Sequence, residues 1–218
     1  ARFNLRGADV SAPELRSWCE PIRRRLVFIN GAAASGPFLP ALTGPERIVI
    51  TATKSGTETS APRFGRFFAE AVADPRADLD RDGGTSVLEA FLHASKRVEA
   101  SYAEQGLLPT EHPLLEDNGD GLGTSPDFFR GLVAATPATA DKPRDGARAG
   151  QTTLVPTPAE RALPPALRRR RDELEVALLA LRDQRSKLPE SAYFARLERL
   201  LLQLARIYQQ ADSVAPDP

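Results

Sequence analysis

Two short apolar runs indicate the strands of a parallel sheet. The stretches LVFIN at 26–30 and RIVITAT at 47–53 are apolar and β-branched at consecutive positions, as strands are when helices cover both of their faces. A connection between parallel strands has to cross the sheet, and Phe38, Leu39 and Leu42 suit a short helix packed on it. The first half of the chain therefore has the pattern of an α/β domain.

Helices are predicted before and after these strands. Ser11 and Glu14 stand three residues apart, which is the spacing of a capping box at the start of a helix. Apolar residues continue behind it at helical spacing, so a helix is predicted over about 12–24. Two further helices are predicted over about 62–73 and 86–105.

The composition changes after residue 134. Residues 135–157 are rich in Pro, Ala, Thr and Gly, which predicts a linker between an α/β part at 1–134 and a C-terminal part at 158–212. In the C-terminal part, apolar residues keep heptad spacing on two stretches that meet at Pro189, which predicts an antiparallel helical hairpin. The heptad positions are Leu167, Leu174, Leu178, Leu181 and Leu188 on the first stretch, and Phe194, Leu197, Leu201, Leu204 and Tyr208 on the second.

The second stretch of the hairpin also predicts a contact surface. Leu200 and Ile207 widen its apolar stripe beyond a two-position seam, which indicates contact with more than one neighbour. We therefore expect the hairpin to dock on the α/β part, to bind a protein partner or to self-associate, in preference to closing only on itself.

Composition and charge exclude several classes of function. The 218 residues carry 29 basic and 29 acidic side chains, so no net field favours nucleic acid or an anionic membrane. Four arginines at 168–171 spread around a helix among acidic neighbours, which is typical of a solvated face.

The longest apolar runs are only a few residues, so no membrane span is expected. Cys19, the single cysteine, excludes an internal disulfide bond and is expected to be a small core residue.

The strongest chemical signal is the stretch DLDRDGGTSVLE at 78–89. Carboxylates at its positions 1, 3 and 5, glycine at 6, serine at 9 and glutamate at 12 have the spacing of an EF-hand calcium loop. Carboxylates this close repel one another unless a cation or solvent relieves them. The predicted Ca²⁺ ligands are Asp78, Asp80, Asp82, Gly84, Ser86 and Glu89.

Another interpretation of this loop is an exposed acidic turn in which Thr85 or Ser86 only caps the next helix. Thr85 occupies position 8, where such loops usually place an aliphatic residue that pairs with a neighbouring loop, so a lone loop of weak affinity is expected. Weak loops suit millimolar calcium, which favours an extracytoplasmic location. A second acidic turn at 116–123 has less specific spacing and is interpreted as a tight turn in preference to a metal site. Its polar residues are Glu116, Asp117, Asn118 and Asp120.

Several stretches together resemble one family. They are RFNLRGADVSAPEL, LVFINGAAASGPFLPAL, ERIVITATKSGTE, RFGRFFAEAV, ADLDRDGGTSVLEAF and TEHPLLEDNGDGLGT, in this order over residues 2–124. They look like the later part of bacterial proteins similar to the legumain branch of the caspase-like cysteine peptidases. The resemblance implies a three-layer α/β/α sandwich in which a histidine and a cysteine, each following a strand, face each other at the carboxyl edge of the sheet. It also implies an oxyanion site built from the backbone amides after the cysteine.

Transferred to this sequence, the resemblance leaves no catalytic dyad. The family's cysteine falls at about Ala33, and Ser35 and Gly36 match the small residues after it. The family's histidine and the strand before it should precede Ala1, so the N-terminal part of the fold is expected to lie outside this chain. Bacterial relatives with Ser or Ala in this turn favour natural loss of the cysteine over a laboratory substitution.

Other residues are not expected to replace the dyad. Ser35 would need a base within hydrogen-bond reach, and the two histidines, His93 and His112, are expected at the surface or as caps. The loop after the second predicted strand reaches the same edge of the sheet, where ligands of α/β proteins bind, although an ordinary polar loop is favoured. The residues of this remnant pocket would be Lys54, Ser55, Thr57 and Glu58.

These patterns favour a noncatalytic pseudopeptidase that calcium stabilises and that acts in binding or scaffolding through its sheet edge and its helical hairpin. The alternative is a cysteine peptidase seen as an inactive fragment or a Cys-to-Ala mutant, whose catalytic histidine lies upstream of residue 1. A third hypothesis is that another chain supplies the missing strands, because the remaining ones would expose sheet edges.

Overall fold

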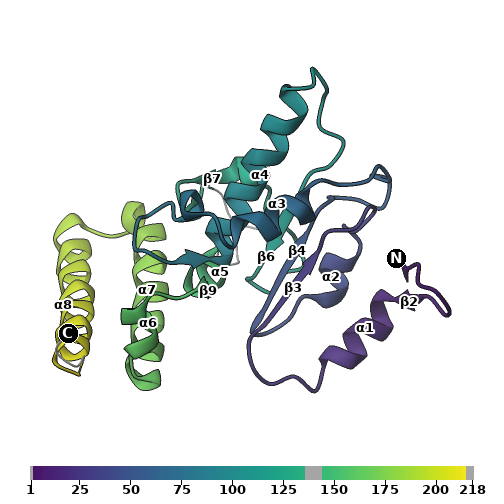
Figure 1. Ribbon diagram of the computed structural model, residues 1–218. Coiled ribbons are helices and arrows are strands. Elements are labelled where there is room, and N and C mark those ends of the chain that lie inside the picture. The colour runs from purple at the N-terminus through teal and green to yellow at the C-terminus, as the bar shows by residue number, and fades with distance from the viewer. Residues whose placement is uncertain (1, 136–143, 215–218) are drawn as a thin grey trace. The chain divides into compact units, whose positions relative to one another are not determined.

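The structure is a computed structural model that describes residues 2–135 and 144–214 (Figure 1). The chain divides into two compact units between Val155 and Pro156. The first unit is mixed α/β, and the second is helical. None of the helices in the described ranges combines the length and apolar character that a bilayer-spanning segment needs.

A small mixed sheet forms the centre of the first unit. Strands β3 (Leu26–Asn30) and β4 (Arg47–Thr51) pair in parallel, as predicted, and β6 (Leu114–Glu116) pairs with β4 in the antiparallel direction. The order β3-β4-β6 makes β4 the central strand, whose side chains from Ile48 to Thr51 are all buried. Ile29 of the outer strand β3 is 37% exposed. The sequence did not predict β6, because three residues carry too little periodicity.

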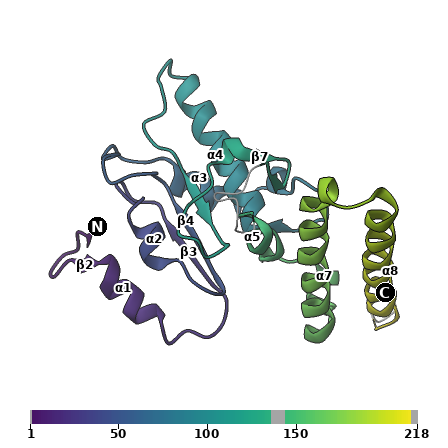
Figure 2. The ribbon, with the colours of Figure 1, turned by 180° about the vertical axis from the view of Figure 1, so that it is seen from behind.

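Helices cover both faces of this sheet (Figures 1 and 2). Successive strand side chains point to opposite faces, so Ile48 and Ile50 pack in one cluster and Val49 in another. The first cluster contains residues of α3 (Phe64–Ala71) and α4 (Val87–Ala103). The second contains residues of α1 (Ala12–Cys19) and α2 (Phe38–Leu42).

The helix boundaries follow local chemistry. The Ser11–Glu14 capping box begins α1, as predicted. The helix ends at Cys19 and not at about 24, because Pro21 has no N–H to continue the backbone ladder. The helix predicted over 86–105 is α4, and the helix predicted over 62–73 is the shorter α3. Short elements of the first unit are β1 (Arg2–Phe3), β2 (Val10–Ser11), η1 (Pro75–Ala77), η2 (Pro126–Phe128), β7 (Phe129–Arg130) and β8 (Val133–Ala134).

The predicted linker over 135–157 is wrong for residues 144–155, whereas 136–143 lie outside the described residues. Here α5 (Ala147–Gln151) is followed by β9 (Thr153–Val155), which pairs in the antiparallel direction with β5 (Thr85–Ser86). Asp145 and Ala149 are buried, with 3% and 0% exposure. Tertiary contacts thus order a segment whose composition alone indicates a loose connection, and the unit boundary moves to residue 155.

The second unit contains the predicted helical hairpin. Helix α6 (Pro158–Ala162) precedes α7 (Pro165–Asp183), and the turn η3 (Arg185–Lys187) leads into α8 (Glu190–Val214). A hydrogen bond of 2.8 Å from Arg170 in the first half of α7 to Gln203 in the second half of α8 fits antiparallel helices.

The heptad assignment for α8 is wrong in part. Tyr193 and Ile207 are buried, whereas Phe194, Leu201 and Tyr208 are about half exposed. Apolar residues cover more than half of this helix, so packing selects a face that lies one residue away from the predicted seam. On α7 the predicted positions Leu174 and Leu181 are buried.

Candidate metal centre and sheet edge

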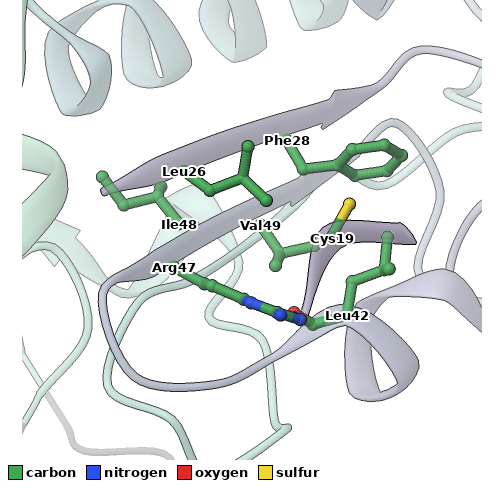
Figure 3. A pocket seen from close by; sticks show the side chains of 7 residues that line it. All are labelled: Cys19, Leu26, Phe28, Leu42, Arg47, Ile48 and Val49. Atoms are coloured by element: carbon green, nitrogen blue, oxygen red, sulfur yellow. The ribbon is translucent and has the colours of Figure 1, made fainter. Parts of the chain in front are cut away.

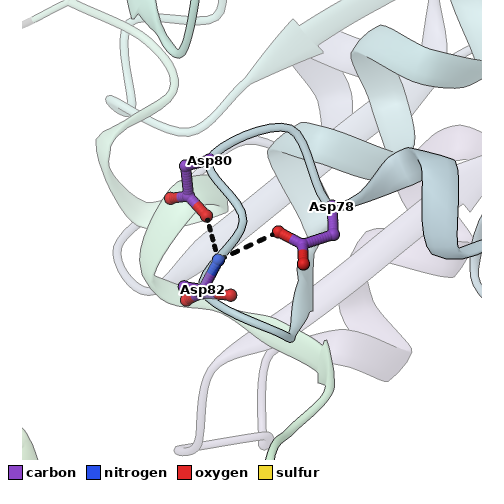
Figure 4. Close-up of side chains that lie close together, drawn as sticks. All are labelled: Asp78, Asp80 and Asp82. Atoms are coloured by element: carbon purple, nitrogen blue, oxygen red, sulfur yellow. Dashed lines mark hydrogen bonds between the residues drawn. The ribbon is translucent and has the colours of Figure 1, made fainter.

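Three of the predicted calcium ligands come together in the loop between η1 and α4. Ligand oxygens of Asp78, Asp80 and Asp82 all lie within 4.8 Å of one another (Figure 4). The Asp82 N–H donates to Asp78 Oδ1 at 3.1 Å and to Asp80 Oδ1 at 3.2 Å. The Gly83 N–H donates to Asp78 Oδ2 at 2.9 Å. These hydrogen bonds fold the backbone of the loop around the Asp78 carboxylate. The side chains of all three aspartates therefore converge.

The glycine at position 6 of the loop makes a sharp turn. Gly83 has a φ of 86°, in the left-handed region that residues with a side chain rarely adopt. Arg81, two residues earlier, also has a positive φ of 63°. Two such residues in three positions give the tight curl that carries Asp78, Asp80 and Asp82 to one side of the loop.

The other predicted ligands have different roles in the structure. Glu89 Oε2 accepts hydrogen bonds of 2.8 Å from both the N–H and the hydroxyl of Ser86, so these two residues form the capping box of α4. Glu89 Oε1 accepts the Leu79 N–H at 2.8 Å. The Gly84 N–H donates to Asp82 Oδ1 at 2.7 Å. Glu89 is therefore a buried structural acceptor here, and its carboxylate does not belong to the group of converging oxygens.

The electrostatics of the cluster disfavour the ionised form of Asp80. Partial burial raises the pKa of this carboxyl, and the nearby charges of Glu89, Asp82 and Asp78 raise it further. A cation among the carboxylates would reverse this effect, since an opposite charge stabilises the ionised form. Carboxylate oxygens are hard ligands, and Ca²⁺ and Mg²⁺ are the ions that prefer them.

Strand β9 supplies the pairing partner that the sequence did not reveal for this loop. Thr85, at position 8, pairs with Val155 of β9, and the Val87 N–H donates to the Thr152 carbonyl at 2.8 Å. The loop is thus held against a strand of its own chain. Sequence reasoning missed this partner because β9 lies within the stretch interpreted as a linker.

The second acidic turn is built around backbone hydrogen bonds. Glu116 Oε1 accepts the N–H groups of Gly119 and Asp120, and Asp117 accepts those of Gly146 and Ala149. Both carboxylates are buried. This arrangement fits the tight turn that the sequence favoured.

The turn after β3 carries Ala33 at the position where the resemblance would place a cysteine. Ala33 ends in a methyl group, and Ala34 after it has a strained positive φ of 52°. Ser35 is fully buried, and its Oγ lies 3.0 Å from Thr53 Oγ1 and accepts the Thr53 N–H at 3.1 Å. Ser35 therefore fastens the turn to the loop after β4.

The histidines do not assemble a catalytic group with Ser35. His112 Nδ1 lies 2.7 Å from Glu58 Oε1, and His93 Nε2 lies 3.3 Å from Asp74 Oδ2. Within the described residues, no hydrogen bond joins either histidine to Ser35. In the predicted remnant pocket the Lys54 N–H donates to Glu58 Oε2 at 3.1 Å, and Ser55 Oγ lies 2.8 Å from Thr57 Oγ1. The Glu58 carbonyl accepts the Ala34 N–H at 2.8 Å.

Cys19 is a core residue, as predicted. It is buried and lines a narrow pocket on one side of the sheet (Figure 3). That pocket has no room for a water molecule. The other lining residues are Leu26, Phe28, Leu42, Arg47, Ile48 and Val49.

Comparison with models of known protein families, with curated proteins and with solved structures finds no match for this chain. The chain's own residues therefore carry the case for a function.

Proposed function

We propose that this chain is a noncatalytic relative of the legumain-like, caspase-like cysteine peptidases, that calcium stabilises its fold, and that it acts by binding other proteins. Helices on both faces of the β3–β4 pair support a caspase-like three-layer arrangement. The motifs over 2–124 support the family assignment. Exposed apolar residues of α8 support a binding role for the hairpin: Phe194, Leu201, Leu202 and Tyr208.

The observation that carries the calcium proposal is the convergence of Asp78, Asp80 and Asp82 in a loop with EF-hand spacing. The spacing does not by itself bring the carboxylates together, because acidic residues close in sequence often point in different directions. Their convergence is therefore a second, independent observation. Ca²⁺ would be held by these carboxylates, with Gly84, Ser86 and Glu89 as the further candidates that the spacing indicates. The metal would relieve carboxylate repulsion and tie η1 to α4, and it would supply no reaction chemistry.

The noncatalytic proposal rests on position 33. A methyl group cannot attack a carbonyl carbon, and the neighbouring Ser35 hydroxyl is buried and bonded to Thr53. We expect the purified chain to hydrolyse no peptide substrate. Peptide turnover that a substitution at Ser35 abolishes would contradict this proposal.

Thermal unfolding tests the calcium proposal. A ligand that binds only the folded state stabilises it, so roughly 5 mM calcium should raise the midpoint of unfolding by several degrees relative to a chelator. Asp80→Ala should remove that increase. Asp127→Ala, which changes an exposed aspartate outside the loop, should keep it. Identical melting curves of the wild-type chain in calcium and in chelator would refute the proposal.

A further inference from the structure

Two buried aspartates hold residues 144–155 against the rest of the first unit. Asp145 Oδ1 accepts the N–H groups of Asp117 at 3.0 Å and of Asn118 at 3.2 Å. In return, Asp117 accepts the N–H of Gly146 at 2.9 Å and of Ala149 at 2.8 Å. Each side chain thus binds the backbone that carries the other, so the turn after β6 and the start of α5 are joined by a reciprocal clasp.

The clasp places acidic groups together away from water. Asp117 and Asp145 are 1% and 3% exposed, and Glu116 beside them is fully buried. The charged groups that face the pair are Glu116 from β6 and Arg148 from α5. Arg148 donates to the backbone carbonyl of Asp117 and lies 3.9 Å from Glu46, so part of its charge is engaged elsewhere.

This environment favours a proton on the pair. Burial raises the pKa of Asp145 to about 8, and the neighbouring charges of Asp117 and Glu116 act in the same direction. Burial also raises the pKa of Asp117. Asp145 Oδ2 lies 2.7 Å from Thr124 Oγ1, so a protonated Asp145 can donate to this hydroxyl while its Oδ1 still accepts two N–H groups.

We propose that Asp117 and Asp145 form a proton-dependent latch that fastens residues 144–155 to the first unit at neutral and acidic pH and loosens in alkaline solution. Loss of the proton leaves two adjacent buried charges beside Glu116, and separating the two segments lets water solvate them. Strand β9 lies in the fastened segment and pairs with β5. Release therefore also deprives β5 of its partner.

Hydrogen exchange of individual amides tests the latch. The N–H groups of Asp117, Asn118, Gly146 and Ala149 are its donors, and their protection factors should fall at least about tenfold between roughly pH 6.5 and pH 9. The N–H groups of β4 should keep their protection over the same range. Equal protection of the four donors across the range would overturn the proposal.

The substitution Asp145→Asn tests the charge of this side chain separately from its hydrogen bonds. Asparagine keeps the Oδ1 acceptor and offers Thr124 a donor, yet it cannot ionise. In this variant the protection factors of the four donor N–H groups should stay the same at all these pH values. In Asp127→Asn they should fall with pH as they do in the wild type. A pH-dependent loss that persists in Asp145→Asn would overturn the proposal. If the variant does not fold, titration of the wild-type Asp145 carboxyl carbon by NMR decides, and a midpoint near the ordinary aspartate value of about 4 contradicts the latch.

Discussion

Glu111 shows how one buried side chain joins three parts of the first unit. Its carboxylate accepts the N–H of Arg63 at 2.8 Å and of Phe64 at 2.9 Å, at the start of α3. It also accepts the hydroxyl of Tyr102, near the end of α4, at 3.2 Å. Glu111 itself precedes β6 and is only 2% exposed. A negative charge at a helix N-terminus is stabilising, so one acceptor caps α3 and ties it to α4.

Glu111→Ala should lower the free energy of unfolding by about 2–4 kcal/mol, because it leaves buried backbone donors without an acceptor. Glu111→Gln should cost less, since its amide oxygen still accepts. Urea denaturation followed by circular dichroism would measure both. Glu99→Ala is a matched control on the exposed face of α4 and should change stability by less than about 0.5 kcal/mol. Equal effects of the changes at 111 and 99 would contradict this role.

The sequence did not predict that Arg171 is buried. The run at 168–171 was expected to be a solvated face mixed with acidic groups, and Arg170 fits that expectation through Glu173 at 2.9 Å. Arg171 is instead 9% exposed, and it contacts Glu160 of α6 and Asp172. One of its acidic partners, Glu160, lies on a separate helix, so no local pattern marks which of the four arginines turns inward.

At the scale of elements, Gly36 sets how closely the turn after β3 approaches the loop after β4. A Cβ on Gly36 would lie 2.4 Å from the Lys54 carbonyl carbon and 2.5 Å from the Ser55 nitrogen. These are backbone atoms and cannot rotate away. The contact explains why a glycine stands at this position in a turn that has no nucleophile.

Gly36→Ala should therefore destabilise the first unit by about 3 kcal/mol or more, since overpacking against backbone forces the sheet edge apart. Calorimetry of the variant would show a lower unfolding temperature or no cooperative transition. Gly150→Ala adds the same methyl group within α5, where its nearest contact is Leu88 at 3.7 Å. That variant should be neutral or slightly stabilising. A wild-type transition in Gly36→Ala would contradict the close approach.

The hairpin provides a second comparison between matched residues. Leu181 of α7 is 5% exposed, and Leu202 of α8 is 53% exposed. Leu181→Ala should cost the helical unit about 2–4 kcal/mol, and Leu202→Ala less than about 1 kcal/mol. Hydrogen exchange of the α7 amides reports the stability of this unit separately from the first. A larger effect from Leu202→Ala would indicate that α8 packs through the opposite face.

The elements that the sequence predicted well are those whose signal is local. The β3 and β4 runs, the Ser11–Glu14 capping box and the α4 periodicity each depend on residues close in sequence. Strand β9 and helix α5 were missed because their order comes from distant partners: β5 for one, and Asp117 for the other. The three aspartates of the loop were predicted from spacing, whereas the capping role of Glu89 competes with the ligand role that the same spacing indicates.

At the scale of the whole molecule, the dependence of stability on pH reflects carboxyl groups whose pKa is lowered in the folded state and carboxyl groups whose pKa is raised. Hydrogen bonds from Arg76 hold the pKa of Asp74 well below its usual range. Its contribution is therefore present above about pH 4 and is lost only as the solution becomes strongly acidic. Burial raises the pKa of Asp145 to about 8. Its contribution is complete below about pH 4 and is lost as the pH rises through about 8.

Between about pH 5 and pH 8, Asp74 is ionised in both the folded and the unfolded chain, so the buried pair of Asp117 and Asp145, whose pKa values burial raises, should determine the slope. We expect the free energy of unfolding of the first unit to fall as the pH rises, by at most about 1.4 kcal/mol per pH unit for each extra proton that the folded pair holds. Urea denaturation at several pH values in this range would measure the slope, and Asp145→Asn should flatten it. A wild-type chain that becomes more stable toward pH 8 would show that Asp145 is ionised in the folded state, with Arg148 and the backbone N–H groups outweighing its burial.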